Sequence, residues 1–219
     1  MNLFDINQKI KHASYEDIQY NLQEDIIQDD PFEQFLLIFS LALETATYDP
    51  SAMVLATVDE QEFPDARVVL LKELDDRKFI FYTHYESKKA KELTHHPVAA
   101  LHFYWPHLLS QVKVRGTVTK VDRQKSEAYF ASRPRGSQIG AHAWVQSSIL
   151  SGREELEDRV KQQEERFAGQ QTIPCPETWG GYALQPFEYE FLQKRQFRMH
   201  DRFLYSLSGD IWKRIRLAP

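Results

Sequence analysis

The chain has 219 residues, of which 42% are hydrophobic and 27% charged, and its formal net charge is −5. This length suits one well-buried domain rather than two, and the composition is that of a soluble globular protein. The net negative charge argues against general nucleic-acid binding and against an anionic membrane surface as the main partner.

The first predicted element is a helix that begins after Asp30. Asp30 is a suitable N-cap, Pro31 suits the first turn, and apolar residues recur at helical spacing up to Leu43. Runs rich in β-branched and aromatic residues predict strands over 52–59, 66–74, 78–84, 98–105, 110–122, 180–193, 201–207 and 211–217. Further helices are predicted over 86–97, 123–133 and 152–169, and an irregular segment over 134–148.

This order of elements predicts a fold that is mainly β with peripheral helices. Short strands in meander order, interrupted by helices and completed by C-terminal strands, favour an antiparallel barrel. No Gly-rich phosphate turn follows any predicted strand, so a β-α-β dinucleotide fold is disfavoured.

Neither targeting nor a disulfide is indicated. The first 22 residues lack the basic-then-apolar organisation of a signal peptide, and no apolar run approaches the length that crosses a bilayer. Cys175 is the only cysteine and lies between two prolines, which indicates a loop thiol in a reducing compartment. We therefore expect a soluble, cytoplasmic protein.

One basic cluster lies at the start of a predicted helix, and a second lies on a predicted strand. If Ser87 caps its helix, Lys88 and Lys89 occupy the first turn, where the helix dipole favours a bound phosphate, although a solvated lysine pair has the same pattern. Arg67 and Lys72 bracket four apolar residues and are expected on opposite faces of a strand, where they either reach two anions or mark where the strand meets water.

A third cluster surrounds a predicted helix end. Tyr129 and Arg133 lie one turn apart on one helix face, and the helix is expected to stop near Pro134. Arg135, Ser137 and Gln138 are then expected in a loop. An aromatic ring, guanidinium groups and hydroxyls so close in sequence suit a phosphorylated ring compound, with chance clustering as the alternative.

The stretch RMHDRFLY near the C-terminus forms a fourth pattern. As a strand it places Arg198, His200 and Arg202 on one face. That face is either a solvated sheet edge or the wall of a site for a flat anion. The histidines match no metal-ligand spacing and there is no Gly-x-Ser-x-Gly elbow, so neither a metal site nor a serine hydrolase is predicted.

The ordered motifs resemble the pyridoxine (pyridoxamine) 5′-phosphate oxidase family. The matching segments are DDPFEQF, AMVLATVD, RVVLLK, FYTHYESKKA, SQVKVRG, YFASRPRGSQIGA, QSS, WGGY, RMHDRFLY and RLAP. The resemblance implies an FMN-binding split antiparallel β-barrel and a homodimer with FMN at the subunit interface. It also implies one such domain over residues 30–219, preceded by a poorly matched N-terminal segment, residues 1–29, that we expect to be mobile.

The resemblance also implies a set of site residues. The expected FMN contacts are Arg67, Val68, Val69, Leu70, Leu71, Lys72, Tyr82, Thr83, Lys88, Lys89, Gln111, Gln146, Ser147, Leu192 and Arg202. The expected substrate contacts are Lys72, Tyr129, Arg133, Ser137, Arg198, Met199 and His200, with Arg198 and His200 as the catalytic pair over the pyridine ring.

The implied reaction makes pyridoxal 5′-phosphate. Hydride passes from the exocyclic carbon of pyridoxine or pyridoxamine 5′-phosphate to the flavin, and oxygen then reoxidises the flavin to give hydrogen peroxide. The amine substrate gives an imine that water releases as ammonia. The alternatives are a related flavin oxidase for another ring system, as in phenazine pathways, and a flavin or pyridoxal-phosphate binder without turnover.

The chain departs from the family pattern at three places. Leu192 replaces a tryptophan that contacts the flavin, which predicts weaker flavin packing. Lys88 replaces an arginine, which keeps the charge but loses the bidentate fork. The N-terminal segment is poorly matched, so no lid role is expected for Tyr15 or Tyr20.

Overall fold

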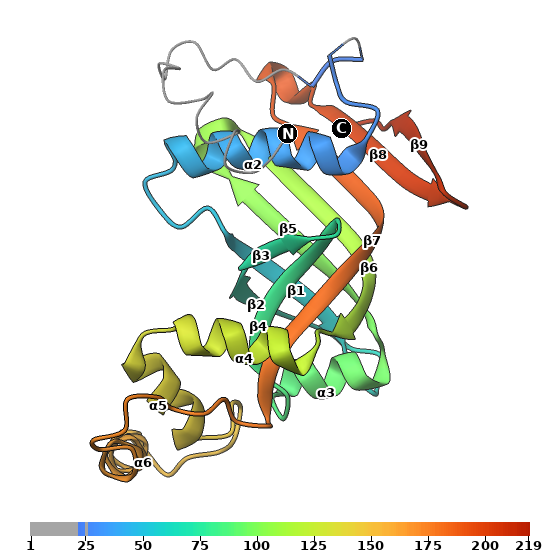
Figure 1. Ribbon diagram of the computed structural model, residues 1–219. Helices are drawn as coiled ribbons and strands as arrows, with labels where there is room; N and C mark the ends of the chain where they lie inside the picture. The colour runs from blue at the N-terminus through green and yellow to red at the C-terminus, as the bar shows by residue number, and fades with distance from the viewer. Residues whose placement is uncertain (1–21, 25) are drawn as a thin grey trace.

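The computed structural model describes residues 22–24 and 26–219 (Figure 1). The expected mobile segment and the two tyrosines Tyr15 and Tyr20 fall largely or wholly outside this part of the chain. The strands are β1 (Ala52–Val58), β2 (Pro64–Leu70), β3 (Glu73–Asp75), β4 (Lys78–His84), β5 (Val98–Trp105), β6 (Ser110–Lys120), β7 (Trp179–Gln193), β8 (Asp201–Ser208) and β9 (Ile211–Arg216). The helices are α2 (Pro31–Thr45), α3 (Lys88–His95), α4 (Arg123–Ser132), α5 (Arg135–Ala143) and α6 (Arg153–Arg166), with short 3₁₀ turns at Pro106–Leu108 and Gln196–Arg198.

The described strands form one antiparallel sheet in the order β2-β1-β5-β6-β7-β4-β3. The long strand β7 divides the sheet, because its first half pairs with β4 and its second half pairs with β8, which in turn pairs with β9. The sheet curls on itself, and the backbone N–H of Lys72, just past β2, donates to the Ile80 carbonyl of β4 at 2.9 Å. This confirms the predicted antiparallel barrel with peripheral helices.

Helix α2 lies across one end of the sheet (Figure 1), and its aromatic side chains pack into the core there. It begins as predicted, since the Asp30 side chain accepts hydrogen bonds from the N–H groups of Phe32 and Glu33. Phe35 is fully buried and its ring lies 4.8 Å from Phe79 of β4 and 5.1 Å from Phe103 of β5, centroid to centroid. Such contacts anchor the helix firmly on the sheet.

Helices α4, α5 and α6 gather at the other end of the molecule (Figure 1). A second core joins them to the start of β7, with Phe130, Ile139, Phe167 and Trp179 all buried. Because Tyr82 of β4 packs against this core, the core holds α4 and α5 beside that strand, where a cleft opens. No helix in the described part of the chain has the length and apolar character needed to span a bilayer.

Candidate functional site

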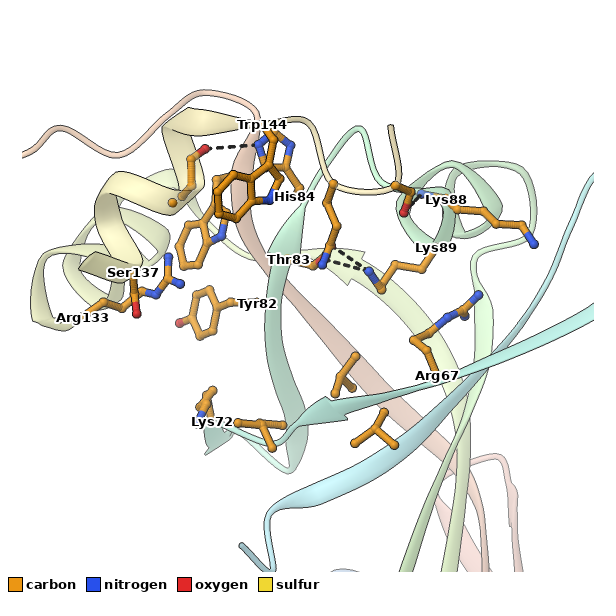
Figure 2. A pocket seen from close by; sticks show the side chains of 18 of the residues that line it. Arg67, Lys72, Tyr82, Thr83, His84, Lys88, Lys89, Arg133, Ser137 and Trp144 are labelled. Carbon is orange, nitrogen blue, oxygen red and sulfur yellow. Dashed lines mark hydrogen bonds between the residues drawn. The ribbon is translucent and has the colours of Figure 1, made fainter. Parts of the chain in front are cut away.

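A cleft of about 800 Å³ opens where β2, β4, α3 and α5 meet (Figure 2). The predicted site residues on its wall are Arg67, Val68, Val69, Leu70, Lys72, Tyr82, Thr83, Lys88, Lys89, Tyr129, Arg133, Ser137, Gln146 and Ser147. Figure 2 shows Arg67, Lys88 and Lys89 toward one side of the cleft, and Lys72, Arg133 and Ser137 toward the other. Tyr82 and Thr83 of β4 lie between the two sides.

Lys89 is the most buried cation on the first side. Only 7% of the residue is exposed, and its Nζ donates to Gln146 Oε1 at 2.8 Å and to Thr83 Oγ1 at 3.2 Å. Both acceptors are neutral. Desolvation first, and repulsion by Arg67 second, lower the pKa of Lys89 to about 8. The ammonium group has lost most of its hydration, and its two hydrogen-bond partners carry no charge. A bound anion would stabilise it, so this position favours anion binding.

Arg67 and Lys88, in contrast, are held by carboxylates of the chain. Asp65 Oδ2 lies 2.7 Å from Arg67 Nη2 and 2.7 Å from Lys88 Nζ, and Glu92 Oε2 lies 2.9 Å from the same Arg67 nitrogen. The hydrogen bond from Lys88 is the largest of the effects that lower the pKa of Asp65 to about 2. The two cations are thus kept in place in the absence of a ligand.

Ser87 takes the N-cap position of α3, as predicted, but does not cap it with its side chain. Its hydroxyl donates to the His84 carbonyl at 2.7 Å. The backbone N–H of Lys88 instead donates to Ser147 Oγ at 3.4 Å, and Ser147 has a positive φ of 74°. The loop that carries Gln146 and Ser147 is therefore bound to the start of the helix. The two lysines occupy its first turn, as the sequence predicted.

The second side of the cleft carries two cations, Lys72 and Arg133. Neither Lys72 nor Arg133 forms an ion pair with any residue that the structure describes. The Arg133 guanidinium lies 4.7 Å from the centroid of the Trp179 ring, and its Nη1 is buried without a hydrogen-bond partner in the described part of the chain. Burial lowers the pKa of Arg133. A buried donor that no protein group satisfies is a strong sign of an anion site.

Aromatic rings build the floor beside Arg133. The rings of Tyr82 and Tyr129 stack with centroids 4.0 Å apart, and Trp179 lies 5.5 Å from Tyr82 and nearly parallel to it. Burial is the main cause that raises the pKa of Tyr82 to about 12, so its hydroxyl stays neutral at physiological pH. These rings offer a flat apolar surface next to the Arg133 guanidinium.

The segment after Pro134 is a helix, so the prediction of a loop there was wrong. Pro134 ends α4 and at the same time takes the N-cap position of α5. The helix is stabilised by burial of Ile139 and by the Gln138 amide, which donates to the Phe130 and Ala131 carbonyls at 3.0 and 3.1 Å. Proline fits the beginning of a helix as well as its end. As a result Ser137 lies in the first turn of α5, facing the cleft (Figure 2).

Two further predictions about backbone placement were wrong. Lys72 lies two residues beyond β2, so the alternation of the strand no longer applies and both Arg67 and Lys72 line the cleft. The stretch before Asp201 is not a strand either. Phe197 and Arg198 have positive φ angles of 55° and 61°, and β8 begins only at Asp201. The expected single face of Arg198, His200 and Arg202 therefore does not exist.

The remaining predicted residues lie away from the cleft. Leu71 is buried in the core, and Gln111 pairs with Leu192 across β6 and β7. Arg202 pairs with Leu192 in register and its Nε donates to Glu190 at 2.7 Å. Met199 and His200 line a separate hollow with Arg216 and the C-terminal residues Leu217, Ala218 and Pro219. Arg198 lies in the adjacent turn. In Figure 1 this region, near β8, is at the opposite end of the molecule from α5.

Sequence reasoning missed several side chains that shape the cleft. Asp65 and Trp179 line it, and Glu92 lies just beneath. The sequence contains two spacings that could have identified the carboxylates. Asp65 precedes Arg67 by two residues on a strand, so their side chains share a face. Glu92 follows Lys88 by four residues on a helix, so their side chains lie one turn apart. His84 and Trp144 also line the cleft and were not expected.

Comparisons with known proteins converge on one family. The family described as "Pyridoxamine 5'-phosphate oxidase" matches residues 42–167, and the "Pyridoxine 5'-phosphate oxidase C-terminal dimerisation region" matches residues 179–219. A pyridoxine/pyridoxamine 5'-phosphate oxidase of Rubrobacter xylanophilus is 48% identical over 198 residues, covering 90% of this chain and 91% of the relative. One of Legionella pneumophila (strain Paris) is 47% identical over 201 residues, covering 92% and 93%.

Solved structures agree on the fold. PhzG from Burkholderia lata 383, in complex with tetrahydrophenazine-1-carboxylic acid, superposes with a TM-score of 0.84 at 27% identity, covering 91% of this chain and 98% of PhzG. A pyridoxamine 5'-phosphate oxidase-related, FMN binding protein from Nostoc punctiforme PCC 73102 gives a TM-score of 0.70 at 16% identity, covering 87% and 98%, and supports the fold alone. The predicted split β-barrel is thereby confirmed.

Proposed function

The chain belongs to the pyridoxamine 5'-phosphate oxidase family, and from that premise we propose that it is an FMN-dependent oxidase that makes pyridoxal 5'-phosphate. Its substrates would be pyridoxine 5'-phosphate and pyridoxamine 5'-phosphate. The observation that carries the proposal is the pair of cationic sides in one cleft, with the aromatic side chain of Tyr82 between them. Two phosphorylated ring compounds, a cofactor and a substrate, would use both sides.

The first side fits the phosphate of FMN. Lys89 is desolvated and donates only to neutral oxygens, while Arg67 and Lys88 are already held in place by Asp65. The apolar end of β2, with exposed Val68, runs from this cluster toward Lys72 and would pack against the flavin rings. When bound, FMN would supply the electron-accepting ring, and the residues of the chain would bind it and exclude water from one face.

The second side suits the phosphate of the substrate. Arg133 and Lys72 form no ion pair with any described residue, and Ser137 adds a hydroxyl in the first turn of α5. Arginine binds phosphate through two parallel N–H bonds, which orients the ester as well as attracting it. With its phosphate there, the pyridine ring would lie toward Tyr82 and β2, the side where the flavin is proposed to bind.

The overall reaction balances with molecular oxygen as oxidant. Pyridoxine 5'-phosphate would lose two hydrogens from its exocyclic carbon and oxygen, and O₂ would gain them as hydrogen peroxide. For pyridoxamine 5'-phosphate, one water is consumed and ammonia is released as well. The contribution of this chain to the step is to hold the two rings in contact at a fixed orientation.

A homodimer would complete the site. Within one chain the cleft lacks the predicted ring contacts Arg198 and His200, which lie at the other end of the molecule. That end contains the C-terminal part of the matched dimerisation region and exposes Phe197 and Met199 at 87% and 67%. We propose that a second copy brings Gln111, Leu192, Arg198, Met199, His200 and Arg202 against the cleft, with FMN at the interface.

The test compares phosphorylated and unphosphorylated substrates. We expect the purified protein to bind FMN and to consume oxygen with pyridoxine 5'-phosphate but about 100-fold less efficiently with pyridoxine, because the Arg133 contact is lost. Equal rates on both compounds would contradict the role of the second side. A preference for an unphosphorylated tricyclic substrate would instead favour a relative of PhzG.

A further inference from the structure

A buried carboxylate lies beneath the first side of the cleft. The Glu92 side chain is 4% exposed, and its Oε2 accepts hydrogen bonds from Arg67 Nη2 at 2.9 Å and from the Thr57 hydroxyl at 2.5 Å. Arg67 Nη1 in turn donates to Thr57 Oγ1. The three side chains form a closed ring of hydrogen bonds that joins β1, β2 and α3.

This ring holds one end of the guanidinium group and leaves Arg67 on the cleft wall. Arginine has a long, flexible side chain that loses conformational entropy whenever it binds an anion. Here Thr57, which is 2% exposed, and Glu92 hold Arg67 from beneath, and Asp65 Oδ2 lies 2.7 Å from the same Arg67 Nη2, so the orientation of Arg67 is set before any ligand arrives. Orientation in advance lowers the cost of binding.

Glu92 also offsets the positive charge of the cluster. The first turn of α3 carries Lys88 and Lys89, where the helix dipole already disfavours cations. Glu92 Oε1 lies 3.7 Å from Lys88 Nζ and accepts no hydrogen bond from the residues that the structure describes. Its negative charge therefore acts on Lys88 and on the desolvated Lys89 as well as on Arg67.

We propose that Glu92 is a positioning residue for the cofactor phosphate, acting through Arg67 and Thr57 without touching the ligand. The inference rests on the proposed function, since it assumes that the first side binds the phosphate of FMN. The proposal predicts the direction in which FMN affinity changes when the Glu92 charge is removed. Removing a negative charge close to a phosphate would tighten binding if simple repulsion dominated, whereas loss of the anchored Arg67 weakens it.

The charge balance adds a second expected effect. The charged groups that act on Lys89 are Arg67, which disfavours its protonated form, and Glu92 and Asp65, which favour it. The neighbouring His84 has a pKa lowered mainly by burial, so it is neutral where Lys89 titrates. Without the Glu92 charge, Lys89 loses its proton at lower pH. FMN affinity of the variant should then begin to fall at lower pH than that of the wild type.

The experiment measures the dissociation constants of FMN and of riboflavin, which lacks the phosphate, by quenching of flavin fluorescence. We expect Glu92→Gln to weaken FMN about tenfold and Thr57→Val about fivefold, with riboflavin affected much less. Glu157→Gln is the matched control, because Glu157 forms an exposed pair with Arg153 one helical turn away on α6. It should bind both flavins like the wild type.

Several outcomes would overturn the inference. They are unchanged or tighter FMN binding in Glu92→Gln, an equal loss of FMN and riboflavin, and a pH profile that does not move. If Glu92→Gln does not fold, Thr57→Val alone decides, because it removes the hydroxyl and keeps the shape. Failure of the wild type to bind FMN would contradict the proposed function itself and is distinguished from these results.

Discussion

At the scale of single residues, we expect Lys89 to make binding of the proposed FMN cofactor depend on pH. Its pKa in the ligand-free protein is lowered to about 8, mainly by desolvation. A bound phosphate stabilises the ammonium, so affinity should fall as the pH rises through about 8. Titrations of FMN from pH 6 to 10 would show this fall, and Lys89→Arg should flatten it because a guanidinium stays charged. A flat wild-type profile would contradict the account.

The lowered pKa of Lys89 also predicts how the free energy of unfolding changes with pH. The pKa of Lys89 lies below its ordinary value of 10.5, so the unfolded chain binds more protons between about pH 8 and 10.5. The contribution of this residue to the free energy of unfolding of the ligand-free protein therefore rises with pH across that window. Compared with Lys89→Met, the wild type should gain stability over this range in denaturant titrations.

Arg133 should separate substrate binding from cofactor binding. Arg133→Ala removes the buried guanidinium beside Trp179 and is expected to raise KM for pyridoxine 5'-phosphate about 100-fold, equivalent to two charged hydrogen bonds. FMN affinity should change little, because Arg133 lies on the other side of the cleft. Arg115→Ala, which removes an exposed pair with Glu188, is the control. Equal losses of substrate and FMN would contradict the division of the cleft.

The sequence predicted the basic residues of the site better than it predicted the acidic residues that contact them. Lys88 and Lys89 after Ser87 were placed correctly at the start of a helix, because that signal is local. The buried Arg133 Nη1, which has no hydrogen-bond partner among the described residues, and the position of Glu92 beneath Arg67 depend on contacts between distant strands and helices. Periodicity alone does not contain that information.

At the scale of elements, the register of β6 and β7 depends on Gly116. The pairing shifts between Arg115 and Gly116, and a Cβ at Gly116 would lie 2.3 Å from the Gln185 carbonyl oxygen. We expect Gly116→Ala to lower the free energy of unfolding by about 2–3 kcal/mol, because the backbone of β7 would have to shift to relieve the clash. Gly152→Ala, with no heavy atom near its Cβ, should change it by less than about 0.5 kcal/mol. Equal stabilities in urea titrations would contradict this assignment.

Most strands were predictable and the helix after Pro134 was not. Alternating burial in β1, β5 and β6 is the period-2 pattern that their sequences predict. Helix α5 was not predicted because Pro134 was taken only as the end of α4, whereas it also occupies the N-cap position of the next helix. The turn at Phe197 and Arg198 was missed because positive φ angles without glycine leave no local signal.

At the scale of the whole molecule, the two groups of predicted site residues lie at opposite ends of one chain (Figure 1). A twofold dimer that joins them would have two sites, each built from both subunits. Co-expression of Arg133→Ala and Arg198→Ala chains tests this. A mixed dimer then contains one intact site, so random pairing should restore roughly a quarter of the wild-type activity. Homodimers of either variant should stay nearly inactive, and a mixture no better than they are would contradict shared sites.

The most direct test of the proposed activity is the visible absorption spectrum of the FMN-loaded protein without oxygen. Addition of pyridoxamine 5'-phosphate should bleach the flavin band, and admission of air should restore it, because electrons pass from substrate to flavin and then to oxygen. A flavin band that remains unchanged although FMN and substrate are both bound would contradict the account. It would identify the chain as a flavin binder without turnover.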